Sequence, residues 1–140
     1  MAISGENRPG KGDRRYELWE EEGTTYLRFI EFFQRILDEI GPGTPERRRC
    51  VMMDNLNAHT NPTVTAMILD AGHQILFRTP YYPVDGPIEY VFNTIQNLLC
   101  IFMREIRDME SLRLKVIQLI GSLPEFSNYF AHVGFQYIEN

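Results

Sequence analysis

The 140-residue chain lacks the sequence features that are typical of zinc-binding, disulfide-rich, membrane-spanning and secreted proteins. It has only two cysteines, Cys50 and Cys100, with no C-x-x-C spacing, so neither a zinc site nor a disulfide framework is expected and a reducing compartment is favoured. No apolar run approaches the ~18 residues of a membrane span, and the amino-terminal segment lacks the apolar core of a signal peptide. The expected location is the nucleus in a eukaryote and otherwise the cytoplasm, without a membrane partner.

Positive charge is also scarce. The chain has 14 basic and 19 acidic residues, for a formal net charge of -5. Modules that bind nucleic acid unaided are usually basic, so a nucleic-acid role here requires local basic patches, further domains or bridging metal ions. The balance is still compatible with metal-dependent nucleases, because they gather carboxylates at their sites.

The hydrophobic content indicates a globular chain. Apolar residues make up 44% of the sequence and aromatic residues 12%, which fits a packed domain rather than a disordered segment. The length corresponds to one domain or part of one.

Periodicity predicts alternating helices and strands. Helices are expected at about 26–40, 62–71, 87–102 and 108–123. A short buried strand is expected at Cys50–Met53, and a further strand at Gln74–Phe77. Weaker strand signals lie at Ala2–Ser4 and in the segment 14–21, and 127–135 forms a short closing segment. Helix, strand, helix, strand, helix is an α/β pattern in which the strands run parallel under crossover helices.

Apolar stripes predict the buried face of the two longest helices. The first stripe consists of Tyr26, Phe29, Ile30, Phe33, Ile36, Leu37 and Ile40, and the other of Ile88, Val91, Phe92, Ile95, Leu98, Leu99 and Phe102. Thr24 or Thr25 can cap the first helix, which Gly41-Pro42 ends. Trp19 and the phenylalanines are expected in the core.

Two carboxylates lie where such folds gather ligands. Asp54 follows the strand Cys50–Met53, and open α/β sheets bind ligands at the carboxyl ends of their strands. Glu89 lies in the first turn of the helix that follows the next strand. Each has an ordinary alternative explanation, since Asp54-Asn55 favours a turn and the helix dipole favours an acidic residue at Glu89. Brought together, the two would suit a hard cation such as Mg²⁺.

Polar neighbours accompany the two carboxylates. Arg78 lies at a strand end on the same edge as Asp54 and is a candidate phosphate contact. Asn93 shares the helical face of Glu89, while His59 is close to Asp54 in sequence and is more often a helix-start group than a ligand or base. Arg78, His59 and Asn93 are the residues expected to contact nucleic acid; Arg47–Arg49 are expected to form a solvated strand entrance.

Three segments together resemble a known family. They are "VMMDNLNAHT", "GHQILFRTPYYPVDGPIEYVFNTIQNLL" and "NYFAHVGF", and they are similar to the catalytic domain of Tc1/mariner-type (IS630-like) transposases, which are DDE superfamily endonucleases. The interval from Asp54 to Glu89 is the one expected between the second and third acidic residues of the Tc1-like branch. The similarity runs from about Ala2 to the carboxyl terminus and is strongest from Val51 to Leu99.

The resemblance implies an RNase H-like fold with five strands, and cleavage and joining of DNA strands at transposon ends. It implies that Asp54 and Glu89 are the second and third catalytic ligands of Mg²⁺ or Mn²⁺, with Asn55 and His59 as neighbours without an assigned role. Two such ions roughly 4 Å apart activate water at a phosphodiester and stabilise the leaving oxygen, but that chemistry normally requires a third carboxylate to bridge the ions.

The chain departs from the family pattern in three respects. The family's first catalytic Asp, on a central first strand, precedes the part matched by "MAISGE", and Asp13 is a poor substitute for it. The upstream helix-turn-helix region is absent as well, and Gly86 stands where the family commonly has Asn. Residues 1–140 are therefore expected to be a partial, single catalytic domain lacking its first strand, inactive alone, with weak or no metal binding. Since unpaired strand edges invite association, self-association is expected.

Two alternative functions are left open. One is a catalytically dead transposase relic that acts as a protein- or DNA-interaction module, favoured by the missing Asp and the acidic balance. The other is a phosphatase-like or nucleotide-binding α/β domain, which the lack of a Gly-rich phosphate loop disfavours.

Overall fold

The computed structural model describes residues 1–5, 13–19, 23–54, 61–79 and 86–135. The chain divides into two compact units, Trp19–Tyr82 and Met1–Leu18 together with Pro83–Asn140. Both combine helices with short strands, so the mixed α/β class expected from the sequence is confirmed. No helix in these ranges has the length and apolar character needed to cross a membrane.

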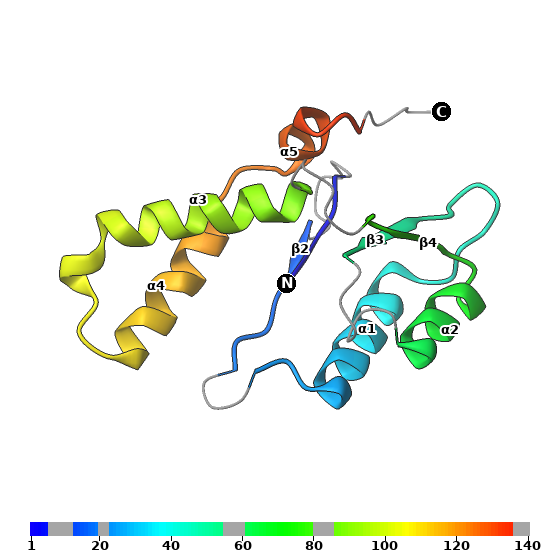
Figure 1. The fold of residues 1–140 in the computed structure, drawn as a ribbon, viewed down its shortest axis with the longest axis horizontal. Helices are drawn as coiled ribbons and strands as arrows, with labels where there is room; N and C mark the ends of the chain where they lie inside the picture. The colour runs from blue at the N-terminus through cyan, green and yellow to red at the C-terminus, as the bar shows by residue number, and fades with distance from the viewer. Residues whose placement is uncertain (6–12, 20–22, 55–60, 80–85, 136–140) are drawn as a thin grey trace. The chain divides into compact units, whose positions relative to one another are not determined.

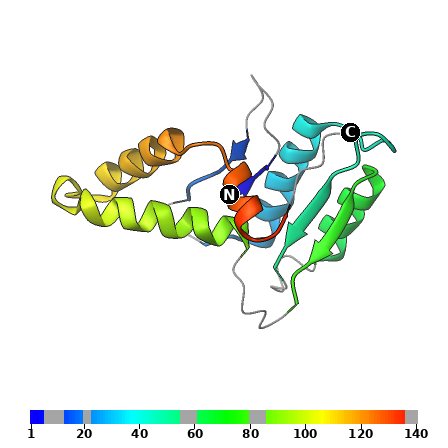
Figure 2. The ribbon, with the colours of Figure 1, turned by 90° about the horizontal axis from the view of Figure 1, so that it is seen from above.

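The unit Trp19–Tyr82 contains a helix followed by a strand–helix–strand motif. Its elements are α1 (Tyr26–Ile40), β3 (Cys50–Met53), α2 (Pro62–Asp70) and β4 (Gln74–Phe77). β3 and β4 pair in parallel, with Met53 opposite Phe77, and they lie side by side in Figures 1 and 2. α2 contacts both β4 and α1, as expected for a crossover between parallel strands.

Local sequence signals set the ends of these helices. Thr25 caps α1 through its side-chain oxygen, and Gly41, with φ of 73°, ends it. Asn61 caps α2 by accepting the backbone N–H of Thr63 at 2.8 Å, and Pro62 occupies the first turn, where its missing N–H costs nothing. The predictions for both helix starts are confirmed.

A buried histidine joins the end of α1 to the start of both strands. The side chain of His73 is 3% exposed, and its Nδ1 accepts the backbone N–H of Arg49 at 3.3 Å. Nε2 therefore carries the proton and donates to the carbonyl oxygen of Gly41 at 2.9 Å. The backbone N–H of Gln74 donates in turn to the carbonyl of Arg49 at 2.9 Å, so this one ring fixes where the parallel ladder begins.

Two glycines allow the backbone to pass close to this ring. A Cβ added to Gly43 would lie 2.3 Å from the carbonyl oxygen of Gly72, and one added to Gly72 would lie 2.4 Å from that of Gly43. Gly72 also has φ of +84°, a conformation that L side chains rarely adopt. Larger residues would force the loop after α1 away from the turn after α2.

The second unit is mainly helical. Its elements are β1 (Ala2–Ile3), β2 (Arg14–Arg15), α3 (Pro87–Ile101), the 3₁₀ turn η1 (Met103–Glu105), α4 (Met109–Ser122) and α5 (Ser127–His132). β1 and β2 pair antiparallel, and α3 and α4 form a helical hairpin (Figure 1). The buried core of the unit is formed by Val91, Ile95, Ile120, Leu123 and Phe126.

Arg14 attaches the amino-terminal strands to the end of α4. Its Nη1 donates to the carbonyl oxygens of Ile120 at 2.6 Å and Leu123 at 2.8 Å, and its guanidinium carbon lies 4.3 Å from the ring centroid of Phe126. A cation at a helix carboxyl end offsets the negative end of the helix dipole. This contact joins the amino-terminal segment Met1–Leu18 to the segment Pro83–Asn140 in one compact unit.

Some expectations about burial and strand length are wrong. Tyr26 is 45% exposed, because its hydroxyl lies 3.0 Å from polar atoms of Asn61 and Thr63 at the surface. Phe92 is 47% exposed, and Cys50 is exposed in a strand that was expected to be buried. Of the strand signal in 14–21, the described residues 14–19 form only β2 (Arg14–Arg15). The described residues form two two-stranded sheets, so the five-stranded arrangement stays a prediction.

The close approach at Gly43 gives a stability prediction. Gly43→Ala should lower the free energy of unfolding by about 2–3 kcal/mol, because the new Cβ meets a backbone carbonyl that cannot move without disturbing His73. Gly23→Ala is the matched control, since a Cβ there has no heavy atom within 4 Å and the change should stay within about 0.5 kcal/mol. Chemical denaturation followed by circular dichroism measures both; equal stability of the two variants would contradict the prediction.

Candidate functional site

The carboxyl end of the parallel strands places Asp54 beside the backbone of Arg78. The backbone N–H of Arg78 donates to the carbonyl of Met53 at 2.8 Å, which extends the ladder one step beyond β4. Asp54 follows Met53 directly, and neighbouring strands lie about 4.8 Å apart. Asp54 and Arg78 are both half-buried, and the Oδ1 atom of Asp54 is buried. An acidic and a basic residue thus leave the same edge of this sheet.

Glu89 lies in the first turn of α3. Gly86 is the N-cap residue, Pro87 opens the helix, and the backbone N–H of Glu89 donates to the carbonyl of Gly86 at 3.1 Å. Gly86 supplies no side-chain cap, so the Glu89 carboxylate is the negative group that meets the positive end of the helix dipole. The Oε2 atom of Glu89 is buried, and the side chain as a whole is half-buried.

The two carboxylates belong to different compact units. Asp54 is part of Trp19–Tyr82, whereas Glu89 is part of the unit that contains Pro83–Asn140. Each is held by its own element, one after a strand and the other at a helix start. Their convergence on one cation therefore stays a prediction.

The remaining candidate residues fall in different surroundings. Asn93 is exposed one turn after Glu89 on α3, so it can accompany the carboxylate on the same helical face. Arg47 and Arg48 are exposed ahead of β3, consistent with a solvated strand entrance. His59 and Asn55 lie outside the described residues.

Asp13 has a structural role in this fold. Its two carboxylate oxygens accept from Nε of Arg14 at 2.7 Å and from Nη2 at 3.0 Å, a bidentate pair that orients the guanidinium toward the end of α4. A carboxylate held in this way is a poor metal ligand, since a bound cation would have to displace Arg14. The pair with Arg14 thus gives a physical reason for not assigning Asp13 as a metal ligand.

An aromatic contact behind Glu89 was not anticipated from the sequence. The ring centroids of Tyr90 and His132 lie 4.9 Å apart with an interplanar angle of 84°, an edge-to-face arrangement. The contact links α5 to the first turn of α3 and so supports the backbone that carries Glu89. "NYFAHVGF" was part of the family resemblance, but nothing in its spacing indicated that His132 would meet Tyr90.

The described residues contain no group of three or more His, Cys, Asp or Glu side chains that could hold a metal ion. Asp54 and Glu89 nevertheless offer hard oxygen ligands of the kind that Mg²⁺ and Mn²⁺ prefer. Either residue alone supplies one carboxylate, which is too little for a site made only of protein groups. A divalent cation at either carboxylate would need further oxygen ligands, such as phosphate or water.

Comparison with known families assigns the chain. The family model described as "DDE superfamily endonuclease" matches residues 9–113, which is more than half of the chain. The protein belongs to the DDE superfamily endonucleases. No curated protein and no solved structure matches it. Nucleases of this superfamily typically use divalent metals, and DDE transposase domains bind DNA.

The substitution Asp13→Asn tests whether the Asp13 carboxylate stabilises the fold or binds a metal ion. Loss of the charged pair should loosen Arg14 from the end of α4 and lower the free energy of unfolding by about 0.5–2 kcal/mol. Removing a carboxylate from a cluster of metal ligands would instead leave stability without cation unchanged or raise it. Thermal unfolding in the presence of a chelator distinguishes the two, with Glu125→Gln, an exposed acidic residue, as the control.

Proposed function

We propose that this chain is the carboxy-terminal part of the catalytic domain of a Tc1/mariner-type (IS630-like) transposase. In this proposal its two units form one partial RNase H-like domain that takes part in DNA transposition, cleaving and joining strands at transposon ends. The family match from residue 9 to 113 supports the proposal, as do the parallel β3–β4 pair and the Asp54–Glu89 interval. The protein is proposed to act in the nucleus if the source is a eukaryote, and otherwise in the cytoplasm.

The placement of Asp54 is the observation that carries the proposal. It directly follows a strand in a parallel pair, the position at which open α/β folds bind ligands. Asp54 and Glu89 are proposed to ligate Mg²⁺ or Mn²⁺ together with DNA phosphate oxygens. The bound cation would supply Lewis-acid activation of water and stabilisation of the leaving oxygen. The protein's part is to hold its carboxylates at a strand end and at a helix start.

DNA contacts are proposed at Arg78, Asn93 and His59. Arg78 leaves the same sheet edge as Asp54, so a phosphate bound near the carboxylate would come within reach of a guanidinium. Asn93 follows Glu89 by one helical turn and is exposed. Because the chain as a whole has a net charge of -5, local cations and bound metal must offset the repulsion of DNA.

Metal binding tests the assignment of the two carboxylates. Titration of Mn²⁺ into the ¹⁵N-labelled protein should broaden amide resonances near both Asp54 and Glu89, because a paramagnetic ion relaxes nearby nuclei. Asp54→Asn and Glu89→Gln should each weaken binding about tenfold or more and reduce broadening at both positions. Glu46→Gln, at an exposed position, is the matched control.

Each variant could instead lose broadening only near its own mutated residue and keep it near the other carboxylate. That result would show two separate weak sites and would contradict a cation shared by Asp54 and Glu89. Wild-type broadening in every variant would leave the interaction-module function as the better explanation of the chain.

The contribution of Arg78 is measured by DNA affinity. Arg78→Gln should weaken duplex binding by roughly threefold to tenfold and lower the slope of log K against log salt by about 1, as expected for loss of one phosphate contact. Arg35→Gln is the control, because Arg35 is an exposed residue in the same unit, within 3.9 Å of Glu31. An unchanged salt slope for Arg78→Gln would exclude a phosphate contact at this residue.

The 140-residue chain is proposed to be inactive by itself. Two assigned carboxylates leave one of the three positions of the site unfilled, and Asp13 is engaged by Arg14. Incubation of supercoiled plasmid with the purified chain and Mn²⁺ should therefore give no more nicking than Asp54→Asn does. Nicking that depends on Asp54 would show that the chain completes its site and would overturn this part of the proposal.

A further inference from the structure

The exposed face of α3 carries side-chain amides and no charged residue after Glu89. Asn93, Gln96 and Asn97 are exposed, and the helix has no Asp, Lys, Arg or further Glu between Glu89 and its end at Ile101. At about 100° per residue, Asn93 and Gln96 lie within roughly 40° of Glu89 around the helix axis, and Asn97 within roughly 80°. These three residues, which we call the amide stripe, thus begin one helical turn after the carboxylate.

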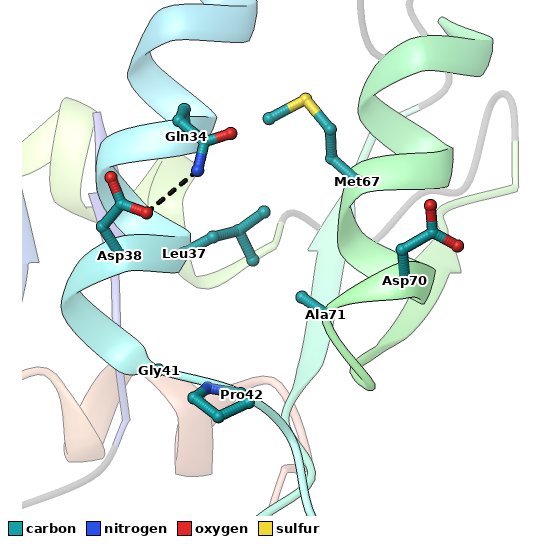
Figure 3. Close-up of a pocket in the computed structure, with 8 residues that line it drawn as sticks. All are labelled: Gln34, Leu37, Asp38, Gly41, Pro42, Met67, Asp70 and Ala71. Carbon is teal, nitrogen blue, oxygen red and sulfur yellow. Dashed lines mark hydrogen bonds between the residues drawn. The ribbon is translucent and has the colours of Figure 1, made fainter.

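The other long helices carry more charged residues. Those of α1 are Arg28, Glu31, Arg35, Asp38 and Glu39, and those of α4 are Glu110, Arg113 and Lys115. The groove between α1 and α2 has two exposed carboxylates, Asp38 and Asp70, on its rim (Figure 3). Carboxylates repel the phosphates of DNA, so a surface of this kind disfavours nucleic acid. The exposed face of α3 beyond Glu89 adds no such repulsion.

The amide stripe is available to a ligand. Within the described part of the chain, none of its three side chains has a hydrogen-bond partner. Thr94, which lies between them in sequence, instead donates its hydroxyl to the carbonyl oxygen of Tyr90 at 2.8 Å. A carboxamide offers two N–H donors, and Asn and Gln side chains are among the groups that donate to phosphate oxygens in protein–DNA complexes. The stripe therefore suits a phosphate backbone.

The helix that carries the stripe is held in place from its other side. Val91 and Ile95 are 0% and 8% exposed and belong to the buried core of this unit. Both residues lie more than about 90° away from Glu89 around the helix axis, so the core holds α3 without covering the amides. A ligand thus meets side chains on a helix whose backbone is already fixed, which lowers the entropic cost of binding.

We propose that the amide stripe binds the sugar–phosphate backbone of the DNA strand whose phosphate is held at Glu89. Asn93, Gln96 and Asn97 donate hydrogen bonds to phosphate oxygens of neighbouring nucleotides. The axis of α3 rises about 12 Å from Glu89 to Asn97, the length of roughly three to four nucleotides of one strand. The inference rests on the proposed function and extends the single contact at Asn93 along the helix. Because neutral amides displace no counterions, these contacts position DNA with little dependence on salt, unlike a contact to Arg78.

Conversion of the amides to carboxylates of the same shape tests the proposal on the full chain. Gln96→Glu/Asn97→Asp should weaken binding to a fluorescent DNA duplex by roughly tenfold or more, because two donors become negative charges that face phosphate. Gln96→Ala/Asn97→Ala should weaken binding by roughly fivefold through the loss of two neutral hydrogen bonds. The alanine variant should keep the wild-type slope of log K against log salt. Fluorescence anisotropy at several salt concentrations measures both quantities.

A matched control separates a local contact from an effect of net charge. Gln74→Glu/Gln118→Glu adds the same two charges at exposed amides on β4 and α4, and its affinity should stay within about twofold of the wild type. Circular dichroism checks that every variant is folded. Equal weakening in the control overturns the proposal, as does wild-type affinity of Gln96→Glu/Asn97→Asp.

Two further outcomes would also count against the amide stripe. A wild type that binds no duplex at about 1 mM protein overturns the proposal, and a lower salt slope in the alanine variant overturns the neutral contact. The Mn²⁺ broadening near Asp54 and Glu89 is measured without DNA. It therefore reports on the proposed metal site separately, and a failure of the stripe is distinguishable from a failure of the proposed function.

Discussion

The ring of His73 is the constraint on which the unit Trp19–Tyr82 depends. A buried imidazole is stable only if both nitrogens find partners, and here the partners are the end of α1 and the backbone just before β3. The ring can bridge them only because Gly43 and Gly72 let two backbone segments approach closely. The register of β3 against β4 follows from this bridge, and with it the position of Asp54 at the far end of the strand.

Local signals in the sequence predicted the positions of the helices and strands well. Contacts between residues far apart in the sequence could not be predicted from such signals. Thr25, Asn61 and Pro62 act within one turn of their own position, so the helix starts could be predicted from neighbouring residues. The exposure of Tyr26 could not be predicted in this way, since it depends on the polar partners Asn61 and Thr63 at the start of another helix. The pairing of Tyr90 with His132 joins elements far apart in the sequence. Asp54 and Glu89 are likewise assigned by motif, and their separation depends on how two units are arranged.

Several of the few cations of this acidic chain have structural tasks. Arg14 closes the end of α4, the guanidinium carbon of Arg28 lies 5.4 Å from the ring centroid of Trp19, and Lys115 secures the hairpin tip. Side chains engaged in this way are less available to neutralise phosphate. In a chain with a formal net charge of -5, cations that are already engaged do little to offset the repulsion between the protein and a polyanion.

The contact between Arg14 and the end of α4 has a consequence for synthesis of the chain. On the ribosome, Trp19–Tyr82 is complete as a continuous segment while later residues are still being added, so its strands and helices can pair early. Arg14 gains its contacts later, because the carbonyls of Ile120 and Leu123 that accept its hydrogen bonds follow it by 106 and 109 residues. Until then the β1–β2 pair lacks the support that the end of α4 gives it through Arg14.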